Sequence, residues 1–352
     1  MMPSVPTPEE QVLFLRNIQR LLAEGQFVAS YKFALLHALA DLAVIKGDDS
    51  GAPLILPTKD IAEKFIELYW QQCRPFEIGG ETSGLILQQN TGKQAAIISG
   101  IIQAQQECGG SFFRLRQQAP DLWGSLVNEV NRTVCVMPLW KLQTVGSDRL
   151  DFLYDNTGQG TTITLKPGVA YCLRAFYGLL RDLIQGAWVR FVQKVNSNRL
   201  GSITDLGTFL FGRERQALEA YRGILVDVQA GKCFYCQKEH HRQMEVDHFV
   251  PWSRYPTDLG HNFVLSHPQC NNSKSDYLAA EEHLAGWTER NRVHREELDA
   301  RLIEIGLPND FLASVRIAEW AYEQTERAKG QVWVSRNVLR HLGPEWRKLL
   351  VA

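Results

Sequence analysis

Residues 231–276 read GKCFYCQKEHHRQMEVDHFVPWSRYPTDLGHNFVLSHPQCNNSKSD, and this stretch decides the fold of the later part of the chain. Cys233 and Cys236 are separated by two residues, and His267 and Cys270 repeat that spacing further along. Two such pairs are typical of structural zinc sites, in which four ligands surround the ion as a tetrahedron. We therefore expect Cys233, Cys236, His267 and Cys270 to bind Zn²⁺, which would replace the core that so short a module lacks.

Two alternatives to this zinc site stay open. The cysteines could be small buried apolar residues, as free cysteines often are. His240 or His241 could replace His267 as the fourth ligand, although both follow Cys236 so closely that closing the chain around one ion would be awkward. His267 has to be neutral to bind, so zinc should be held less tightly below about pH 6.

A second pattern is interleaved with the zinc pairs. It consists of D-H-x-x-P at 247–251, N-F-V-L at 262–265 and C-N-x-x-K at 270–274. In order and spacing these elements resemble the HNH endonuclease family, whose modules fold as two strands and a helix around a metal. The resemblance covers the quoted stretch and implies strands at 244–247 and 263–266, with a helix that begins near residue 271.

The resemblance implies a role for each matching residue. Asp247 and Asn271 would bind a catalytic divalent cation, and His248 would be the general base. Asn262 would brace the loop that holds this base, and Lys274 would contact a phosphate. Carboxylate and amide oxygens are hard ligands that suit Mg²⁺ or Mn²⁺, and two protein ligands leave positions for water and a phosphate oxygen. A histidine with a pKa near ~6.5 is largely neutral at cellular pH and can accept a proton from water.

The reaction implied by these roles is hydrolysis of a phosphodiester bond, which by resemblance leaves 5′-phosphate and 3′-hydroxyl ends. The leading hypothesis is a DNA endonuclease that nicks one strand or cuts both. The alternatives are a zinc-stabilised module that binds nucleic acid or another partner without catalysis, and an RNase.

Each site residue also has a non-catalytic explanation when it is taken singly. Asp247 could be a turn residue, Asn262 and Asn271 could be loop caps, and His248 could be a surface histidine.

The rest of the chain predicts a mainly helical α+β protein. We expect residues 1–200 to form a helical domain with a small sheet near 133–165, residues 201–285 to form the HNH module with its lead-in helix, and residues 286–352 to form a helical segment. The turn at 196–201 marks the first boundary. Helices are predicted at 8–25, 27–45, 60–72, 94–106, 119–130, 168–195 and 213–229, with two or three more between 281 and 350, and short β runs at 133–137, 150–153 and 161–165.

Composition is that of a globular protein, with 45% hydrophobic residues and a formal net charge of -1. Any surface that binds DNA must therefore be a local basic patch. One candidate is 329–348, where basic residues alternate with Trp333 and Trp346; the alternative is a solvated amphipathic helix whose tryptophans lie in the core. A second basic run, 174–199, is scattered over more than one helix face.

The N-terminus does not resemble a secretory signal, and the apolar stretch 31–45 is interrupted by Lys32, His37 and Asp41. We therefore expect a cytoplasmic protein that does not enter a membrane. HNH modules joined to unrelated domains are common in restriction, mobile-element and anti-phage defence proteins. By that analogy we expect a nuclease effector of a prokaryotic defence system, whose N-terminal domain could bind other defence proteins.

Overall fold

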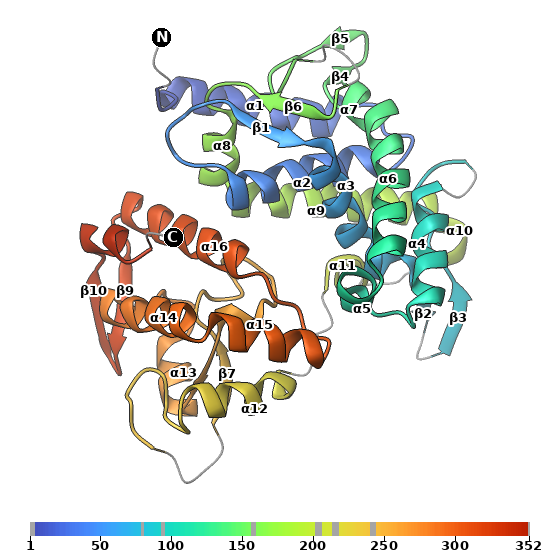
Figure 1. The fold of residues 1–352 in the computed structure, drawn as a ribbon. Coiled ribbons are helices and arrows are strands. Elements are labelled where there is room, and N and C mark those ends of the chain that lie inside the picture. The colour runs from blue at the N-terminus through green and yellow to red at the C-terminus, as the bar shows by residue number, and fades with distance from the viewer. Residues whose placement is uncertain are drawn as a thin grey trace. The chain divides into compact units, whose positions relative to one another are not determined.

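The structure, a computed structural model, describes residues 4–78, 81–92, 96–155, 160–200, 206–212, 218–239 and 244–350. The chain forms two compact units, Met1–Arg213 and Glu214–Ala352. Helices predominate in both, and the strands form two-stranded sheets, so the predicted mainly helical α+β class is confirmed (Figure 1).

The first helix of the N-terminal unit begins where the sequence predicts. α1 (Pro8–Glu24) has a complete capping box: the Thr7 side chain accepts from the backbone N–H of Glu10, and the Glu10 carboxylate accepts from the backbone N–H of Thr7. These bonds satisfy two N–H groups that a helix start would otherwise leave unpaired. The helix ends at Gly25.

The core of this unit is built around α2 (Tyr31–Lys46), most of whose side chains are buried. It packs against α3 (Thr58–Trp70), α8 (Val169–Ala175) and α9 (Tyr177–Val195), as Figure 1 shows. A helix that is apolar on every side needs such neighbours on every side. Within the described residues, no helix is both long enough and apolar enough to cross a membrane.

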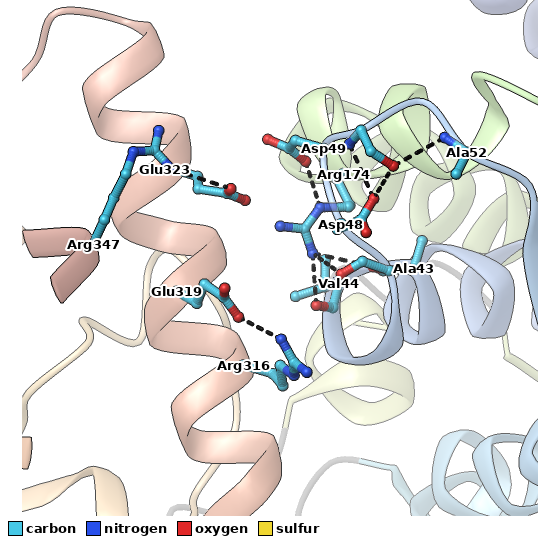
Figure 2. A network of polar contacts seen from close by, with 12 residues as sticks. Ala43, Val44, Asp48, Asp49, Ala52, Arg174, Arg316, Glu319, Glu323 and Arg347 are labelled. Atoms are coloured by element: carbon cyan, nitrogen blue, oxygen red, sulfur yellow. Dashed lines mark hydrogen bonds and ion pairs between the residues drawn. The ribbon is translucent and has the colours of Figure 1, made fainter. Parts of the chain in front are cut away.

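A buried arginine closes the C-terminal end of α2. Arg174 is 2% exposed; its Nε lies 2.6 Å from Asp49 Oδ1, and its guanidinium also donates to the carbonyl oxygens of Ala43, Val44 and Gly47 (Figure 2). The last carbonyls of a helix lack the next turn of donors, and Arg174 donates to those of Val44 and Gly47 as well as to that of Ala43, which also accepts from the N–H of Gly47. Arg174 is therefore a structural part of the core, although the sequence places it in a basic run.

The predicted small sheet is only partly correct. Residues 133–136 are the last turn of α6 (Pro120–Val136), because Val130 and Val134 lie on one buried helix face, and no strand forms at 150–153. The third run is a strand, β6 (Thr162–Leu165), which pairs antiparallel with β1 (Leu54–Pro57) so that Leu54 faces Leu165. The run at 133–137 contains β-branched residues, yet tertiary packing makes it part of a helix, while the run at 150–153 contains none.

The remaining elements of this unit are short. They are η1 (Gln71–Cys73), β2 (Phe76–Ile78), β3 (Glu81–Leu85), α4 (Ala96–Glu107), α5 (Phe112–Gln118), α7 (Pro138–Lys141), β4 (Thr144–Val145), β5 (Asp148–Arg149), α10 (Ser197–Leu200) and α11 (Leu206–Phe211). β2 pairs with β3 and β4 with β5, each as an antiparallel hairpin.

The C-terminal unit begins with α12 (Glu219–Val228) and contains the predicted two strands and helix. β7 (Glu245–His248) pairs antiparallel with β8 (Phe263–Ser266), so that Asp247 faces Val264. The short helix η2 (Gly260–Asn262) leads into β8, and α13 (Pro268–Lys274) follows it. The predicted strands are confirmed to within one residue. The helix starts at Pro268 rather than near Asn271, since proline suits the first helical position.

Beyond the predicted module, the chain forms three helices, α14 (Glu281–Val293), α15 (Arg295–Glu304) and α16 (Phe311–Arg327), as expected. It then forms a hairpin that the sequence did not predict, β9 (Gln331–Ser335) with β10 (Val338–His341), before η3 (Pro344–Lys348). The predicted C-terminal helices are therefore confirmed, and the hairpin is an addition to them.

Two of the five basic residues between 329 and 348 are paired with carboxylates. Trp333 and Trp346 are buried, which confirms that they belong to the core. The amphipathic helix of that alternative is wrong, because β9 and β10 form a hairpin there. Arg340 pairs with the carboxylates of Glu281 and Glu282, and Arg347 pairs with Glu326. Exposed ion pairs of this kind contribute little stability, but they reduce the positive charge that a phosphate backbone would meet.

Candidate active site

The four predicted zinc ligands lie together. The ligand atoms of Cys233, Cys236, His267 and Cys270 are all within 4.8 Å of one another, and Cys236 Sγ is 3.2 Å from His267 Nδ1. The backbone N–H of His267 donates to Cys233 Sγ over 3.4 Å, which ties the second pair to the first. His240 and His241, the alternative ligands, lie outside the described residues.

The chemistry of this cluster suits a zinc ion. Burial, together with the nearby Cys233 and Cys236, raises the pKa of the Cys270 thiol to about 12. Three thiolates so close together repel one another unless a cation lies among them. A tetrahedral Zn²⁺ ion stabilises thiolates and takes the neutral imidazole as its fourth ligand.

Asp247 lies on β7 with its carboxylate almost fully buried. Tyr235 donates its hydroxyl hydrogen to Asp247 Oδ2 over 2.6 Å, and Lys274 Nζ lies 3.1 Å from the same oxygen. Burial, followed by the charge of Asp247, raises the pKa of Tyr235 well above its usual range, so the phenol keeps its proton and acts as a donor. The carboxylate therefore has a fixed orientation before any metal binds.

His248 follows Asp247 and occupies the opposite face of the strand, as the alternation of a β-strand requires. Its Nε2 lies 2.8 Å from Asp258 Oδ1, and the Asp258 side chain is 8% exposed. The imidazole ring packs edge-on against Trp252 and Phe263. A carboxylate acceptor at Nε2 favours the tautomer with its hydrogen on Nε2, which leaves Nδ1 as the nitrogen that can accept a proton.

Asn262 braces the loop that follows His248. Its side chain accepts from the backbone N–H of Val250 over 2.9 Å and donates to the carbonyl of the same residue over 3.0 Å. The backbone carbonyl of Asn262 also accepts from the N–H of Phe249. Arg290 and Trp287 of α14 donate to the carbonyl of His261 and so fix η2 to α14. These hydrogen bonds hold the backbone at Phe249 and Val250, just after His248.

Asn271 lies on α13 and faces β7. Its amide Nδ2 donates to Glu245 Oε2 over 2.9 Å. Because the NH₂ end of the amide is held by a carboxylate, the carbonyl oxygen Oδ1 points away from Glu245 and can act as a ligand. Glu245 and Asp247 are two residues apart on one strand, so their side chains share a face.

Lys274 is fully buried, which differs from the phosphate contact that the resemblance implies. Its Nζ donates to the backbone carbonyl of His248 over 2.9 Å and pairs with Asp247. In this arrangement its ammonium links α13 to β7 and lowers the negative charge of the site. A phosphate could reach it only if the side chain left Asp247.

Three residues of this site were missed by sequence reasoning. Tyr235 and Glu245 lie within the quoted stretch, and the alternation of β7 could have placed Glu245 on the face of Asp247. The sequence has no pattern that would place Asp258 next to His248, because only the path of the loop between Val250 and Asn262 brings the two side chains together.

Comparisons with known families agree with this geometry. Residues 13–209, more than half of the chain, match a family model described as a domain of unknown function, DUF8808. The chain belongs to the DUF8808 family. Within this DUF8808 protein, residues 233–277 match the HNH endonuclease family model, and the zinc-knuckle cluster lies at the same place. The search of curated proteins and the search of solved structures gave no match.

Proposed function

We propose that this DUF8808 protein is a metal-dependent endonuclease that hydrolyses phosphodiester bonds in DNA. The observation that carries the proposal is the orientation of His248 by Asp258 beside the fixed carboxylate of Asp247. A zinc-stabilised binding module would have no need for a buried carboxylate that selects one tautomer of a histidine. The HNH family match supports the same chemistry.

In the proposed reaction His248 acts as the general base. With the hydrogen on Nε2 directed to Asp258, Nδ1 accepts a proton from the attacking water, and the Asp258 carboxylate stabilises the imidazolium that forms. The aromatic rings of Trp252 and Phe263 limit the rotation of the imidazole, so the orientation is kept through the reaction.

Asp247 and Asn271 would hold the catalytic cation. The donor set fits Mg²⁺ or Mn²⁺, since one carboxylate and one amide carbonyl leave room for water and a phosphate oxygen. When bound, such an ion supplies a Lewis acid that stabilises the negative charge developing on the phosphate. Tyr235 and Lys274 hold Asp247, and Glu245 holds Asn271, so the protein prepares both ligands in advance.

The experiment is cleavage of supercoiled plasmid DNA by the full chain with Mg²⁺ or Mn²⁺. We expect nicked or linear product from the wild type and a loss of at least about 100-fold for His248→Ala, the size of a general-base contribution. His341→Ala, at an exposed histidine in the same unit, is the matched control. Full activity in His248→Ala would overturn the assignment. Cleavage of structured RNA but not of plasmid would favour an RNase, and no cleavage of either would favour a binding module.

The biological role that we propose is the nuclease effector of a cytoplasmic anti-phage defence system, with the DUF8808 unit binding other defence proteins. Its support is the frequent joining of HNH modules to unrelated domains in such systems. Expression in a bacterial host should lower phage plaque counts, and His248→Ala should abolish that protection. Equal plaque counts for the wild type and an empty vector would contradict the role and leave the chemistry unaffected.

A further inference from the structure

A groove of about 520 Å³ lies between the HNH helix α13 and the β9–β10 hairpin. Its wall is formed by Gln269, Asn272 and Ser273 on α13, by Tyr277 just after it, and by Arg336 and Leu339 on the hairpin side. The hairpin lies outside residues 233–277, so this part of the wall is not accounted for by the HNH match.

One aromatic layer joins this groove to the proposed active site. Trp333 lines the groove and donates its indole N–H to Ser273 Oγ over 3.0 Å. Its ring packs edge-on against Tyr235 with a centroid distance of 5.1 Å, and Tyr235 donates to Asp247. Trp333 therefore connects the groove wall to Tyr235, the residue that holds the Asp247 carboxylate.

The groove wall has the composition that nucleic-acid strands bind. Arg336 supplies a positive charge, and none of the described residues that line the groove is an aspartate or a glutamate. Tyr277 and Leu339 are 40% and 38% exposed, so an aromatic and an apolar face are open to solvent. The side-chain amides of Gln269 and Asn272 can both donate to and accept from base edges.

We propose that this groove binds an unpaired segment of the nucleic-acid strand that is cut at the HNH site. The inference rests on the proposed nuclease function. Bases of a single strand stack on exposed aromatic side chains while a cation contacts the backbone. A protein surface that binds a duplex normally neutralises several phosphates with basic side chains. Among the described lining residues of this groove, Arg336 is the basic one. The volume falls within the roughly 300–1,000 Å³ of sites that enclose a small ligand, which suits a nucleotide better than a double helix.

The test measures binding apart from cleavage. Full-length protein carrying His248→Ala is titrated against a fluorescein-labelled single-stranded oligonucleotide, and the fluorescence anisotropy gives Kd at several salt concentrations. In this background Arg336→Gln and Tyr277→Ala are compared with two controls. Lys348→Gln removes one charge outside the groove, and Tyr277→Phe keeps the aromatic ring. Melting temperatures confirm that each variant is folded.

We expect Tyr277→Ala to raise Kd by about 5-fold or more, the effect of losing one stacked base. Arg336→Gln should raise Kd and lower the slope of log Kd against log salt by about 0.7, the value for one phosphate contact on a single strand. Both controls should stay within about twofold of the parent. Equal Kd values for all variants would overturn the proposal, as would an effect confined to duplex DNA.

This outcome is separable from the nuclease assignment. If wild-type protein cut no nucleic acid while the groove variants still weakened binding, the proposed catalysis would fail and the groove would stand. If wild-type protein cut DNA while the groove variants bound as tightly as the controls, the groove proposal alone would fail.

Discussion

The amide of Asn271 donates to the carboxylate of Glu245 over 2.9 Å, and this bond fixes which end of the amide faces the proposed metal site. An unrestrained asparagine could present either oxygen or nitrogen, and only the oxygen can bind a cation. Glu245 is therefore a positioning residue for a ligand supplied by another element. The bond also links strand β7 to helix α13.

Exchanging the hydrogen-bond donor and acceptor between residues 271 and 245 tests this positioning role. Asn271→Asp loses the donor to Glu245 and places two carboxylates side by side, so they repel and the new side chain turns out of position; we expect the cleavage rate at saturating Mg²⁺ to fall at least about tenfold. Adding Glu245→Gln supplies an NH₂ donor for the new carboxylate and should restore most of the loss. A double variant no better than Asn271→Asp would contradict a positioning role for Glu245.

The contact between His248 and Asp258 leads to a second prediction. Asp258→Asn can donate to Nε2 instead of accepting from it, which favours the other tautomer and removes the proton acceptor at Nδ1. We expect kcat to fall by about 100-fold or more with KM nearly unchanged. Nitrogen-15 NMR of the imidazole should show the hydrogen moving from Nε2 to Nδ1. An unchanged tautomer in Asp258→Asn would refute this explanation, whatever its activity.

The zinc cluster predicts a stability effect. One zinc ion per chain should be present in purified protein, and His267→Ala should release it and lower the melting temperature of the C-terminal unit, because the ion holds the two ligand pairs together. Cys108→Ser, in the N-terminal unit, is a control that should retain zinc. Metal analysis and differential scanning calorimetry measure both. Zinc-free protein with an unaltered His267→Ala melting temperature would eliminate the site.

The sequence predicts those elements that depend on residues close together in the chain better than those that depend on tertiary packing. The zinc ligands, α1 and strand β8 depend on local spacing, and all were placed correctly. Residues 133–136 also carried a local signal, yet helix α6 extends through them because Val130 and Val134 pack on one face. Local propensity is a weak guide where burial decides the outcome.

The active site shows the same division. The resemblance names Asp247, His248, Asn262 and Asn271, and their roles stay predictions. It does not predict the burial of Lys274, because the contacts that enclose its ammonium, with Tyr235 and with Asp247 on β7, form only in the folded module. Hairpin β9–β10 was also missed, although its turn at Asn337 has a positive φ that asparagine tolerates well.

In the N-terminal unit, Arg174 should be among the residues most sensitive to substitution. Arg174→Met would leave the Asp49 carboxylate and the last carbonyls of α2 buried without their donor, so we expect a loss of about 3–5 kcal/mol in the free energy of unfolding. Arg190→Met, at an exposed position on α9, should change it by less than about 0.5 kcal/mol. Urea unfolding of the full chain compares the two, and equal midpoints would contradict the capping role.

His261 should make the stability of the C-terminal unit depend on pH. Its side chain is fully buried, with Nε2 3.6 Å from Asp299 Oδ1 and the ring edge-on to Phe311. Burial lowers the pKa of His261 to about 4, although Asp299 opposes that effect. The folded pKa lies below the unfolded value near ~6.5, so the stability that depends on neutral His261 is complete above pH 6.5 and is lost as the pH falls toward 4.

His261→Phe removes this titration while it keeps an aromatic ring beside Phe311. The free energy of unfolding of the wild type should therefore fall relative to that of the variant as the pH is lowered from about 6.5 to 4, by up to roughly 3 kcal/mol. Zinc loss at low pH affects both proteins alike and cancels in the difference. His341→Phe, at an exposed histidine, is the matched control. Parallel stability curves for wild type and His261→Phe across this range would show that His261 is not the group that titrates.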